Sequence, residues 1–346
     1  MKRLSVSLPS PRRVPVPRVL RSGIRGVASK SGVSVTAAAD APLFDEELLA
    51  RLRRLVVLSG RAVTEGLAGE HRSRRRGTSP EFSDFKSYSP GDDFRRIDWN
   101  TYARLDGLFV RLSEVTTELS VHLLVDASNS MDWRAGSGVP TKFSYGRRVA
   151  GALAYVALWH FDRVTVAPFG EELTPAFGPA QGRAHIVPML RFLERLAPLG
   201  RTDLPSVLDR YVRARRRPGV LVLVSDLLSG EPDDIRQIMR TLRARGWQTV
   251  VVHVLDEAEL APAALTGGEV GGRPQPAELV EVETGERMRL TPTRDVLLRY
   301  QTAIDGWLAE IESACADEQV AYVRLLTGWS FETLVLRLLH EQGVVA

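Results

Sequence analysis

An α/β fold with a doubly wound, mostly parallel sheet is predicted by three observations. Apolar runs of strand length alternate with helical patterns from Glu118 onward, which indicates a parallel sheet covered by helices on both faces. Two of these runs, 121–125 with only His122 polar and 221–224, are predominantly apolar, as strands buried on both faces usually are. Polar residues follow each run, and ligands of open α/β sheets bind beyond the carboxyl ends of the strands. A site is therefore expected at that edge.

The chain is divided here into three parts. Residues 1–40 are predicted to form a flexible basic arm, because 1–39 contain no acid and many prolines and serines. Its basic residues are Lys2, Arg3, Arg12, Arg13, Arg18, Arg21, Arg25 and Lys30. Three interpretations stay open: contact with nucleic acid or acidic lipid, an organelle transit peptide, or upstream sequence without a role. We favour the last.

Residues 41–118 are predicted to contain a helix and a small β-rich module. Apolar residues recur at helical spacing over 42–68, and acids stand in the first turn, where the helix dipole favours them. Residues 80–114 are rich in turn formers and aromatic side chains instead, which indicates short strands with irregular loops.

Residues 119–346 are predicted to form the main α/β domain. Strands are expected at 121–125, 163–169, 219–225, 248–255 and 320–325, and helices at 143–161, 184–196, 205–213, 232–245, 294–316 and 331–340. Glycines, prolines and alanines over 257–278 indicate an exposed excursion, followed by a short hairpin at 279–290.

The candidate site combines three separate segments of this domain. Asp126, Ser128 and Ser130 follow the first strand, Thr202 lies in a loop that begins with Gly200, and Asp226 ends a later strand. Carboxylate and hydroxyl oxygens are the ligands that Mg²⁺ prefers, and two aspartates roughly neutralise a divalent ion. An alternative interpretation makes Asp126 and Asp226 helix N-caps, because strand-to-helix loops often supply such caps.

These five residues resemble the metal-ion-dependent adhesion site (MIDAS) of von Willebrand factor A domains, which reads Asp-x-Ser-x-Ser, then Thr, then Asp. The resemblance implies a von Willebrand factor A-like, Rossmann-type fold. It also implies Mg²⁺, or Mn²⁺ in its place, at Asp126, Ser128, Ser130, Thr202 and Asp226. In that family the metal keeps one position open for a carboxylate of a partner protein.

A second motif lies upstream, within residues 88–99. Pro90-Gly91 suits the centre of a type II turn, and the acids and arginines that follow could pair beside Trp99. The sequence Pro-Gly-Asp-Asp, Arg, Ile-Asp-Trp resembles the signature of the domain-of-unknown-function 58 (DUF58) family of bacterial proteins. That resemblance implies a von Willebrand factor A-like domain and a MoxR-type AAA+ ATPase as partner. The charged cluster could be a docking surface or a salt-bridged structural turn.

Several functional classes lack their sequence signals. A Walker A loop is missing, no Gly-x-Gly-x-x-Gly follows the first strand, and the second aspartate of haloacid-dehalogenase enzymes is replaced by Ser128. Nothing else in the sequence offers a convincing nucleophile and base. We therefore predict a non-enzymatic, metal-dependent protein-binding module. A metal-dependent phosphate-ester hydrolase and nucleic-acid binding through the arm remain the alternatives.

Composition indicates where the protein works. Cys315 is the single cysteine, so no disulfide can form within the chain, and a reducing cytoplasmic setting is the default. No stretch reaches the roughly 18 consecutive apolar residues that a spanning helix needs. We expect a cytoplasmic protein, with peripheral association with the membrane through partners left open.

Overall fold

The computed structural model describes residues 43–55, 82–89, 97, 99, 102, 107–113, 119–134, 139–198, 200–215, 217–261, 269–270, 273–274, 277–280 and 287–331. The predicted arm, the Pro90–Asp93 turn and nearly all of the predicted helix 331–340 lie outside these residues. The chain forms two compact units, one of residues 1–59 with 120–346 and the other of residues 60–119.

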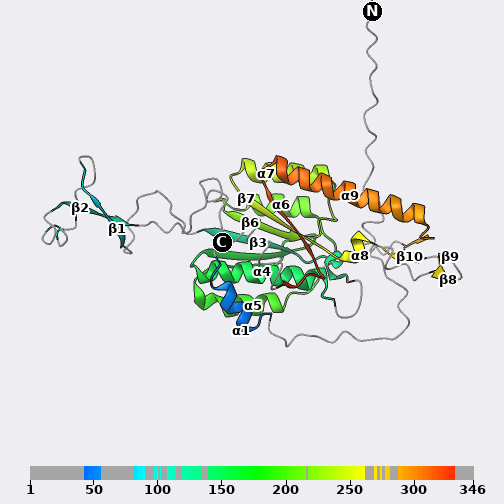
Figure 1. The fold of residues 1–346 in the computed structure, drawn as a ribbon, viewed down its shortest axis with the longest axis horizontal. Helices are drawn as coiled ribbons and strands as arrows, with labels where there is room; N and C mark the ends of the chain where they lie inside the picture. The colour runs from blue at the N-terminus through cyan, green and yellow to red at the C-terminus, as the bar shows by residue number, and fades with distance from the viewer. Residues whose placement is uncertain are drawn as a thin grey trace, which may run out of the picture. The chain divides into compact units, whose positions relative to one another are not determined.

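A six-stranded sheet is the centre of the larger unit, in the order β12-β7-β6-β3-β4-β5 (Figure 1). Its strands are β3 (Ser120–Asp126), β4 (Arg163–Phe169), β5 (Phe177–Gln181), β6 (Val220–Ser225), β7 (Gln248–Leu255) and β12 (Ala321–Leu326). The first four neighbour pairs in that order are parallel, and β4 with β5 is antiparallel. The predicted doubly wound, mostly parallel sheet is therefore confirmed.

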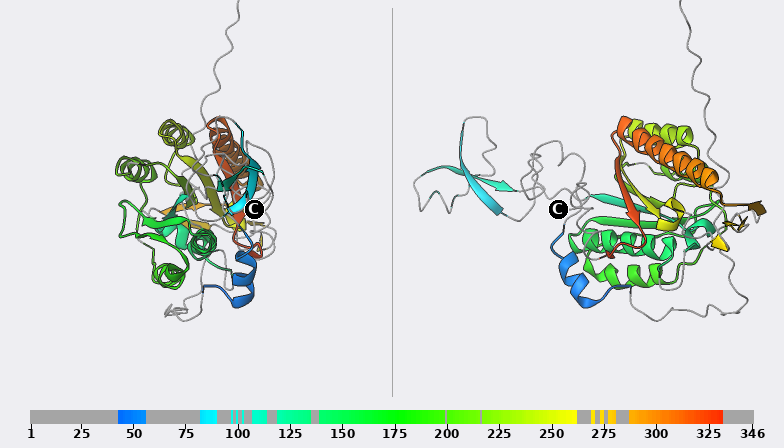
Figure 2. Two further views of the ribbon diagram at one scale, coloured as in Figure 1. Left: turned by 90° about the vertical axis from the view of Figure 1, so that its left-hand side faces the viewer. Right: turned by 45° about the vertical axis from the view of Figure 1, so that its right-hand side comes forward.

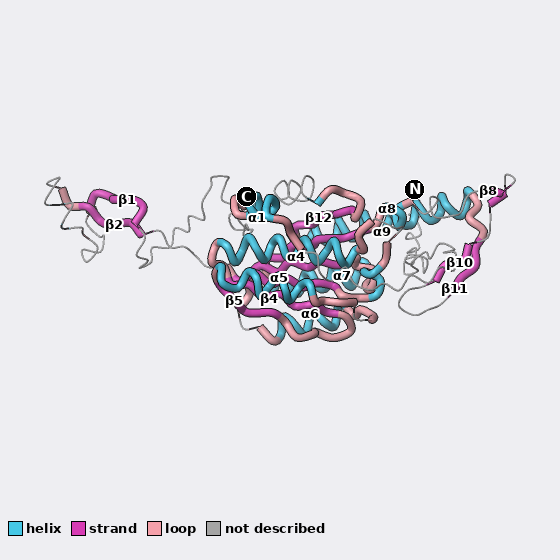
Figure 3. Tube along the Cα trace, turned by 90° about the horizontal axis from the view of Figure 1, so that it is seen from below, coloured by secondary structure: helices cyan, strands magenta, loops and turns pink. Residues whose placement is uncertain are grey.

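Helices cover both faces of this sheet (Figures 1 and 3). On one face lie α1 (Glu46–Leu52), α4 (Lys142–Trp159) and α5 (Ile186–Glu194). On the other lie α6 (Leu204–Arg213), α7 (Pro232–Ala244) and α9 (Arg294–Asp317). Figure 2 shows the same layers from the end of the sheet. None of the described helices combines the length and the apolar character needed to cross a membrane.

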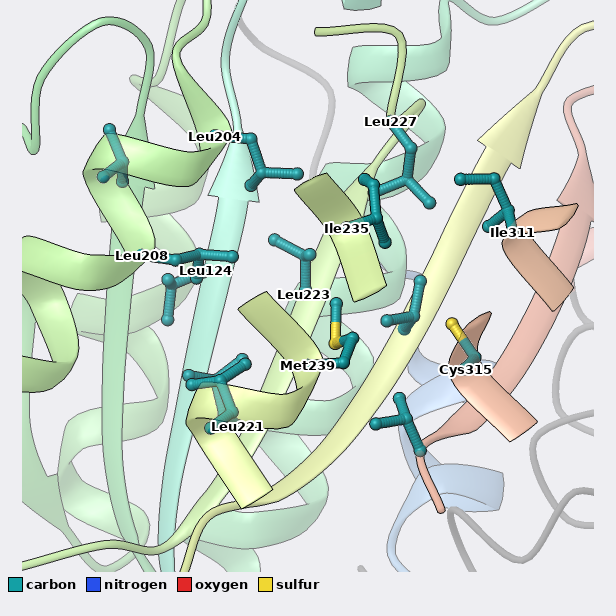
Figure 4. Close-up of a cluster of buried hydrophobic side chains, with 14 of the residues drawn as sticks. Leu124, Leu204, Leu208, Leu221, Leu223, Leu227, Ile235, Met239, Ile311 and Cys315 are labelled. Carbon is teal, nitrogen blue, oxygen red and sulfur yellow. The ribbon is translucent and has the colours of Figure 1, made fainter. Parts of the chain in front are cut away.

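Apolar side chains of the sheet and of α6, α7 and α9 form one buried cluster (Figure 4). Leu124, Leu223 and Met239 are at its centre, and each is fully buried. Cys315 lies in the same cluster on α9, and burial raises the pKa of its thiol to about 12, with a smaller effect from Glu312. This burial holds the central strands in place, so that their carboxyl ends form one fixed edge.

Strand β5 was missed by the sequence analysis. Its residues Gly178 and Pro179 argue against a strand, yet Val164 and Arg163 of β4 pair with Ala180 and Gln181. The strand lies at the edge of the sheet, which is where proline is tolerated because only one side of the strand needs its amide donors.

Helix α1 is shorter than predicted. It begins after Asp45, whose side chain accepts a 2.7 Å hydrogen bond from the backbone N–H of Leu48. It ends at Leu52 in tight turns, in which the N–H of Leu55 donates to the Leu52 carbonyl. Leu48 and Leu52 are buried, and α1 contacts α4. The segment therefore belongs to the larger unit, although the sequence analysis placed it beside the β-rich module.

The predicted excursion and hairpin contain five described elements. Helix α8 (Glu257–Leu260) follows β7, and the strands β8 (Glu269–Val270) and β9 (Arg273–Pro274) pair antiparallel. The predicted hairpin is formed by β10 (Ala277–Val280) and β11 (Arg287–Leu290).

In the smaller unit, β1 (Phe82–Ser87) pairs antiparallel with β2 (Phe109–Ser113). The ring of Trp99 meets that of Tyr102 edge-on at 6.2 Å between centroids, and both rings are exposed.

Candidate functional site

Asp126 is the last residue of β3 and the centre of the candidate site. Its side chain is buried, and its two carboxylate oxygens accept three hydrogen bonds. Oδ1 accepts from the backbone N–H of Ser128 at 3.0 Å and from the hydroxyl of Thr202 at 3.0 Å. Oδ2 accepts from the hydroxyl of Ser225 at 2.6 Å. Asp126 therefore connects the loop after β3 with both of the other segments of the site.

Ser128 and Ser130 place their hydroxyls side by side. The two Oγ atoms lie 2.9 Å apart, and both residues are buried. They stand at the start of the 3-10 helix η3 (Asn129–Asp132), and the Met131 N–H donates to the Ser128 carbonyl. This tight turn points the two hydroxyls in the same direction.

The loop before α6 brings Thr202 to the same place. The backbone N–H of Asn129 donates to the Gly200 carbonyl at 2.6 Å, and the Gly200 N–H donates to Oδ1 of Asn129 at 3.3 Å. Gly200 adopts φ +90°, a conformation that a residue with a Cβ atom rarely takes. Thr202 is partly exposed, unlike the buried residues around it.

Asp226 follows β6, which pairs directly with β3. Its Oδ1 accepts from the Leu228 N–H at 3.2 Å, and its backbone carbonyl lies 2.9 Å from Nε2 of His253 on β7. The α-helix after this loop is capped by Glu231, and η3 is capped by Ser128. Neither Asp126 nor Asp226 is therefore an N-cap of these helices, and the capping interpretation is wrong.

A lysine that the sequence analysis missed is paired with Asp226. Nζ of Lys142, at the first position of α4, lies 2.8 Å from Oδ2 of Asp226 and 2.5 Å from Oε1 of Glu259 on α8. Burial by itself lowers the pKa of this amine. The charges of Asp226 and Glu259 and their hydrogen bonds raise the pKa by more than burial lowers it, so the net change is upward and the amine stays protonated. One signal was present in the sequence: a lysine at a helix N-terminus opposes the helix dipole and needs a local reason.

The two aspartates repel each other. Burial, together with the negative charge of Asp226, raises the pKa of Asp126 to about 6, against a smaller opposing effect of the hydrogen bonds from Ser225 and Ser128. A cation between the two carboxylates would remove this repulsion.

The arrangement fits a small hard cation. In an octahedral Mg²⁺ site with metal–oxygen distances of about 2.0–2.1 Å, neighbouring ligand oxygens lie about 2.9 Å apart. The Oγ atoms of Ser128 and Ser130, which share a hydrogen bond, have this separation. No set of three or more His, Cys, Asp or Glu side chains among the described residues is placed to hold a metal ion. A metal at this edge would therefore depend on the hydroxyls.

The buried histidines do not supply a catalytic base next to a nucleophile. Nδ1 of His122 lies 2.8 Å from the Tyr211 hydroxyl, and Nδ1 of His253 lies 2.7 Å from the Tyr322 hydroxyl. Burial, with a smaller effect of Arg215, lowers the pKa of His122 to about 4. Burial likewise lowers the pKa of His253 to about 4.

Similar proteins include the uncharacterized protein Rv1480 of Mycobacterium tuberculosis and the uncharacterized protein Mb1516 of Mycobacterium bovis. Each is 31% identical over 221 residues, which cover 62% of this chain and 68% of the relative.

Three solved structures are also similar. BatB of Bacteroides thetaiotaomicron, a conserved hypothetical protein, is 15% identical, with 65% of this chain and 98% of that one covered and a TM-score of 0.39. The SpRpn10 VWA domain is 9% identical, with 64% and 94% covered and a TM-score of 0.37. Manganese-loaded TRAP of Plasmodium vivax is 17% identical, with 39% and 56% covered and a TM-score of 0.28.

The model of one family, described as "Protein of unknown function DUF58", matches residues 84–303, which is well over half of the chain. This match includes most of β1, the Ile97 and Trp99 positions of the upstream motif, and all three segments of the candidate site. The protein belongs to the DUF58 family.

Proposed function

We propose that this protein is a non-enzymatic binding module that captures an acidic partner protein through a divalent metal ion. Ser128, Ser130 and Thr202 supply hydroxyl ligands, and Asp126 and Asp226 supply the compensating negative charge. The physiological ion is Mg²⁺, with Mn²⁺ able to replace it, because all five side chains are hard oxygen donors.

One observation carries this proposal. Thr202 and Ser225, which lie 76 and 99 positions after Asp126 in the sequence, both donate hydrogen bonds to its carboxylate. The hydroxyls of Ser128 and Ser130 lie 2.9 Å apart beside it. Structural turns alone do not require this convergence. When bound, the metal supplies a Lewis acid that a partner carboxylate can ligate. The partly exposed Thr202 marks the side from which that carboxylate arrives.

The partner system that we propose is a MoxR-type AAA+ ATPase, acting with this protein in assembly or maturation of a client complex in the cytoplasm. The support for this step is the family: the DUF58 signature found in the sequence is associated with such ATPases. The electrostatics of the site bear on the kind of ligand instead: a metal held mainly by neutral hydroxyls keeps its affinity for a carboxylate.

Binding to a purified MoxR-type ATPase from the same genome tests the proposal. The protein is immobilised, and retention of the ATPase is compared in Mg²⁺, in Mn²⁺ and in excess chelator. We expect retention in either metal and loss of retention in chelator.

Two variants complete this test. Ser130→Ala should lose retention even in Mg²⁺, because it removes one hydroxyl ligand. Ser206→Ala is the matched control, since this exposed serine lies on α6 only four residues from Thr202. Equal retention under all conditions would reject the metal bridge.

A further inference from the structure

The Lys142 ammonium is an internal cation of the candidate site, buried with 0% side-chain exposure. Its two carboxylate partners come from different elements, Asp226 from the end of β6 and Glu259 from α8. Glu259 is itself held in place, because its Oε2 accepts a 2.9 Å hydrogen bond from the Asp256 N–H. The lysine therefore cannot leave Asp226 without a change in the packing around it.

The charges of this cluster leave room for a divalent ion. Asp126, Asp226 and Glu259 carry three negative charges when ionised, and Lys142 carries one positive charge. The remaining charge of minus two is what a divalent cation neutralises. If Lys142 were absent, the surplus would be minus three. If Glu259 were neutral, it would be minus one.

Lys142 also occupies the oxygen of Asp226 that a metal would need for direct ligation. Oδ2 of Asp226 accepts from Nζ at 2.8 Å, and Oδ1 accepts from the Leu228 N–H. A second cation on Oδ2 would meet the ammonium at close range, where the repulsion in a buried site is large.

We propose that Lys142 weakens divalent-ion binding and keeps Asp226 from ligating the metal directly, and that Glu259 sets how strongly it does so. Lys142 is a positioning residue in this assignment, and the inference rests on the metal site proposed above. Keeping Asp226 off the metal has a chemical consequence, because an ion with fewer anionic ligands is more electrophilic toward a partner carboxylate.

Calorimetric titration of the metal-depleted protein with Mn²⁺, and separately with Mg²⁺, tests this inference. Lys142→Met should tighten binding by about tenfold or more, and Glu259→Gln should weaken it by a similar factor, because each changes the charge beside the ion by one unit. The inference requires that the metal affinity change in opposite directions in the two variants. Loss of a purely structural ion pair would instead weaken metal binding, or leave it unchanged, in both. Circular dichroism checks that each variant is folded, and if Lys142→Met does not fold, Lys142→Gln, which also removes the positive charge but can still donate a hydrogen bond to Asp226, takes its place in the comparison.

The control is another cation–carboxylate pair, away from the site. Nε of Arg240 on α7 lies 3.0 Å from Oε1 of Glu318. Arg240→Met and Glu318→Gln should leave the metal affinity unchanged.

The outcomes separate the inference from the proposed function. Metal binding by the natural protein with unchanged affinity in Lys142→Met and Glu259→Gln overturns the inference alone. Binding by Lys142→Met but not by the natural protein supports the inference and overturns the proposed function. Absence of binding in every variant overturns both.

Discussion

The hydroxyl of Ser225 donates a 2.6 Å hydrogen bond to Oδ2 of Asp126 and thereby joins the ends of two neighbouring strands. Oγ of Ser225 also accepts a hydrogen bond from the Leu227 N–H at 3.0 Å, so the Ser225 side chain fixes both the carboxylate and the turn after β6. Leu227 adopts φ +55°, which shows how tightly this turn is constrained.

Ser225→Ala should lower the free energy of unfolding by about 1–3 kcal/mol, because it leaves the buried Leu227 N–H and one Asp126 oxygen without their donor or acceptor. Urea denaturation measures this change. Ser229→Ala is the control, because the buried hydroxyl of Ser229 has no hydrogen-bond partner among the described residues. Equal losses in the two variants would contradict the role given to Ser225.

Mg²⁺ should raise the melting temperature of the natural protein, and chelator should reverse the effect. At a concentration one hundred times the dissociation constant, the expected stabilisation is about 2.7 kcal/mol. Thr202→Ala should abolish most of this increase and change the metal-free protein little, because Thr202 is partly exposed and donates one hydrogen bond. Differential scanning calorimetry with Ser206→Ala alongside would test it, and an unchanged increase in Thr202→Ala would exclude Thr202 as a ligand.

His122 should make the protein sensitive to acid. Burial, with Arg215 nearby, lowers the pKa of His122 to about 4, so the unfolded chain takes up its proton at a higher pH than the folded one. Its contribution to stability is complete above the unfolded pKa of about 6.5 and is lost as the pH falls towards 4. Between pH 7 and pH 5 the expected loss is about 2 kcal/mol.

The measurement is the free energy of unfolding at pH 7 and at pH 5 in His122→Gln. We expect the difference between the two pH values to shrink by about 2 kcal/mol, whatever the variant does to stability at pH 7. His185→Gln, at an exposed position, should keep the full difference. An unaltered difference in His122→Gln would show that His122 is not the group responsible.

Two glycines within helices should respond to alanine in opposite directions. A Cβ atom at Gly151 of α4 would lie 2.8 Å from Cδ2 of Leu43 and 3.2 Å from Cε2 of Phe44. Gly151→Ala should therefore destabilise the protein by about 1–3 kcal/mol and loosen the segment that carries α1. Gly306 of α9 has nothing within 4 Å of such an atom. Gly306→Ala should therefore stabilise the protein by about 0.5–1 kcal/mol.

Urea denaturation of both variants gives these signs. Limited proteolysis shows whether cleavage near residues 43–55 becomes faster in Gly151→Ala. A stabilised Gly151→Ala would mean that the Leu43–Phe44 segment does not pack on α4.

Much of the sheet could be predicted because each of its central strands is encoded by a local run of apolar residues. The runs 121–125 and 221–224 are apolar apart from His122, and each lies within one buried strand, β3 and β6. The edge strand β5 could not be predicted, because its proline and glycine are permitted only by its position at the edge. The end of α1 at Leu52 could not be predicted either, since apolar spacing continues beyond the buried positions.

The sequence alone determined which residues stand at the carboxyl ends of the strands, because a residue that follows a buried parallel strand must lie at that edge of the sheet. Asp126, Ser128, Ser130 and Asp226 were placed at this edge on that basis, whereas Thr202 was named from its loop after Gly200 and from the resemblance to the adhesion-site motif. Tertiary structure alone decided their electrostatic surroundings. Lys142 meets Asp226 from 84 residues away and Glu259 from 117 residues away, and Ser225 meets Asp126 from 99 residues away. The reason is physical: which end of a strand a residue occupies is set by its neighbours in the chain, whereas the charge next to it is set by packing between distant elements.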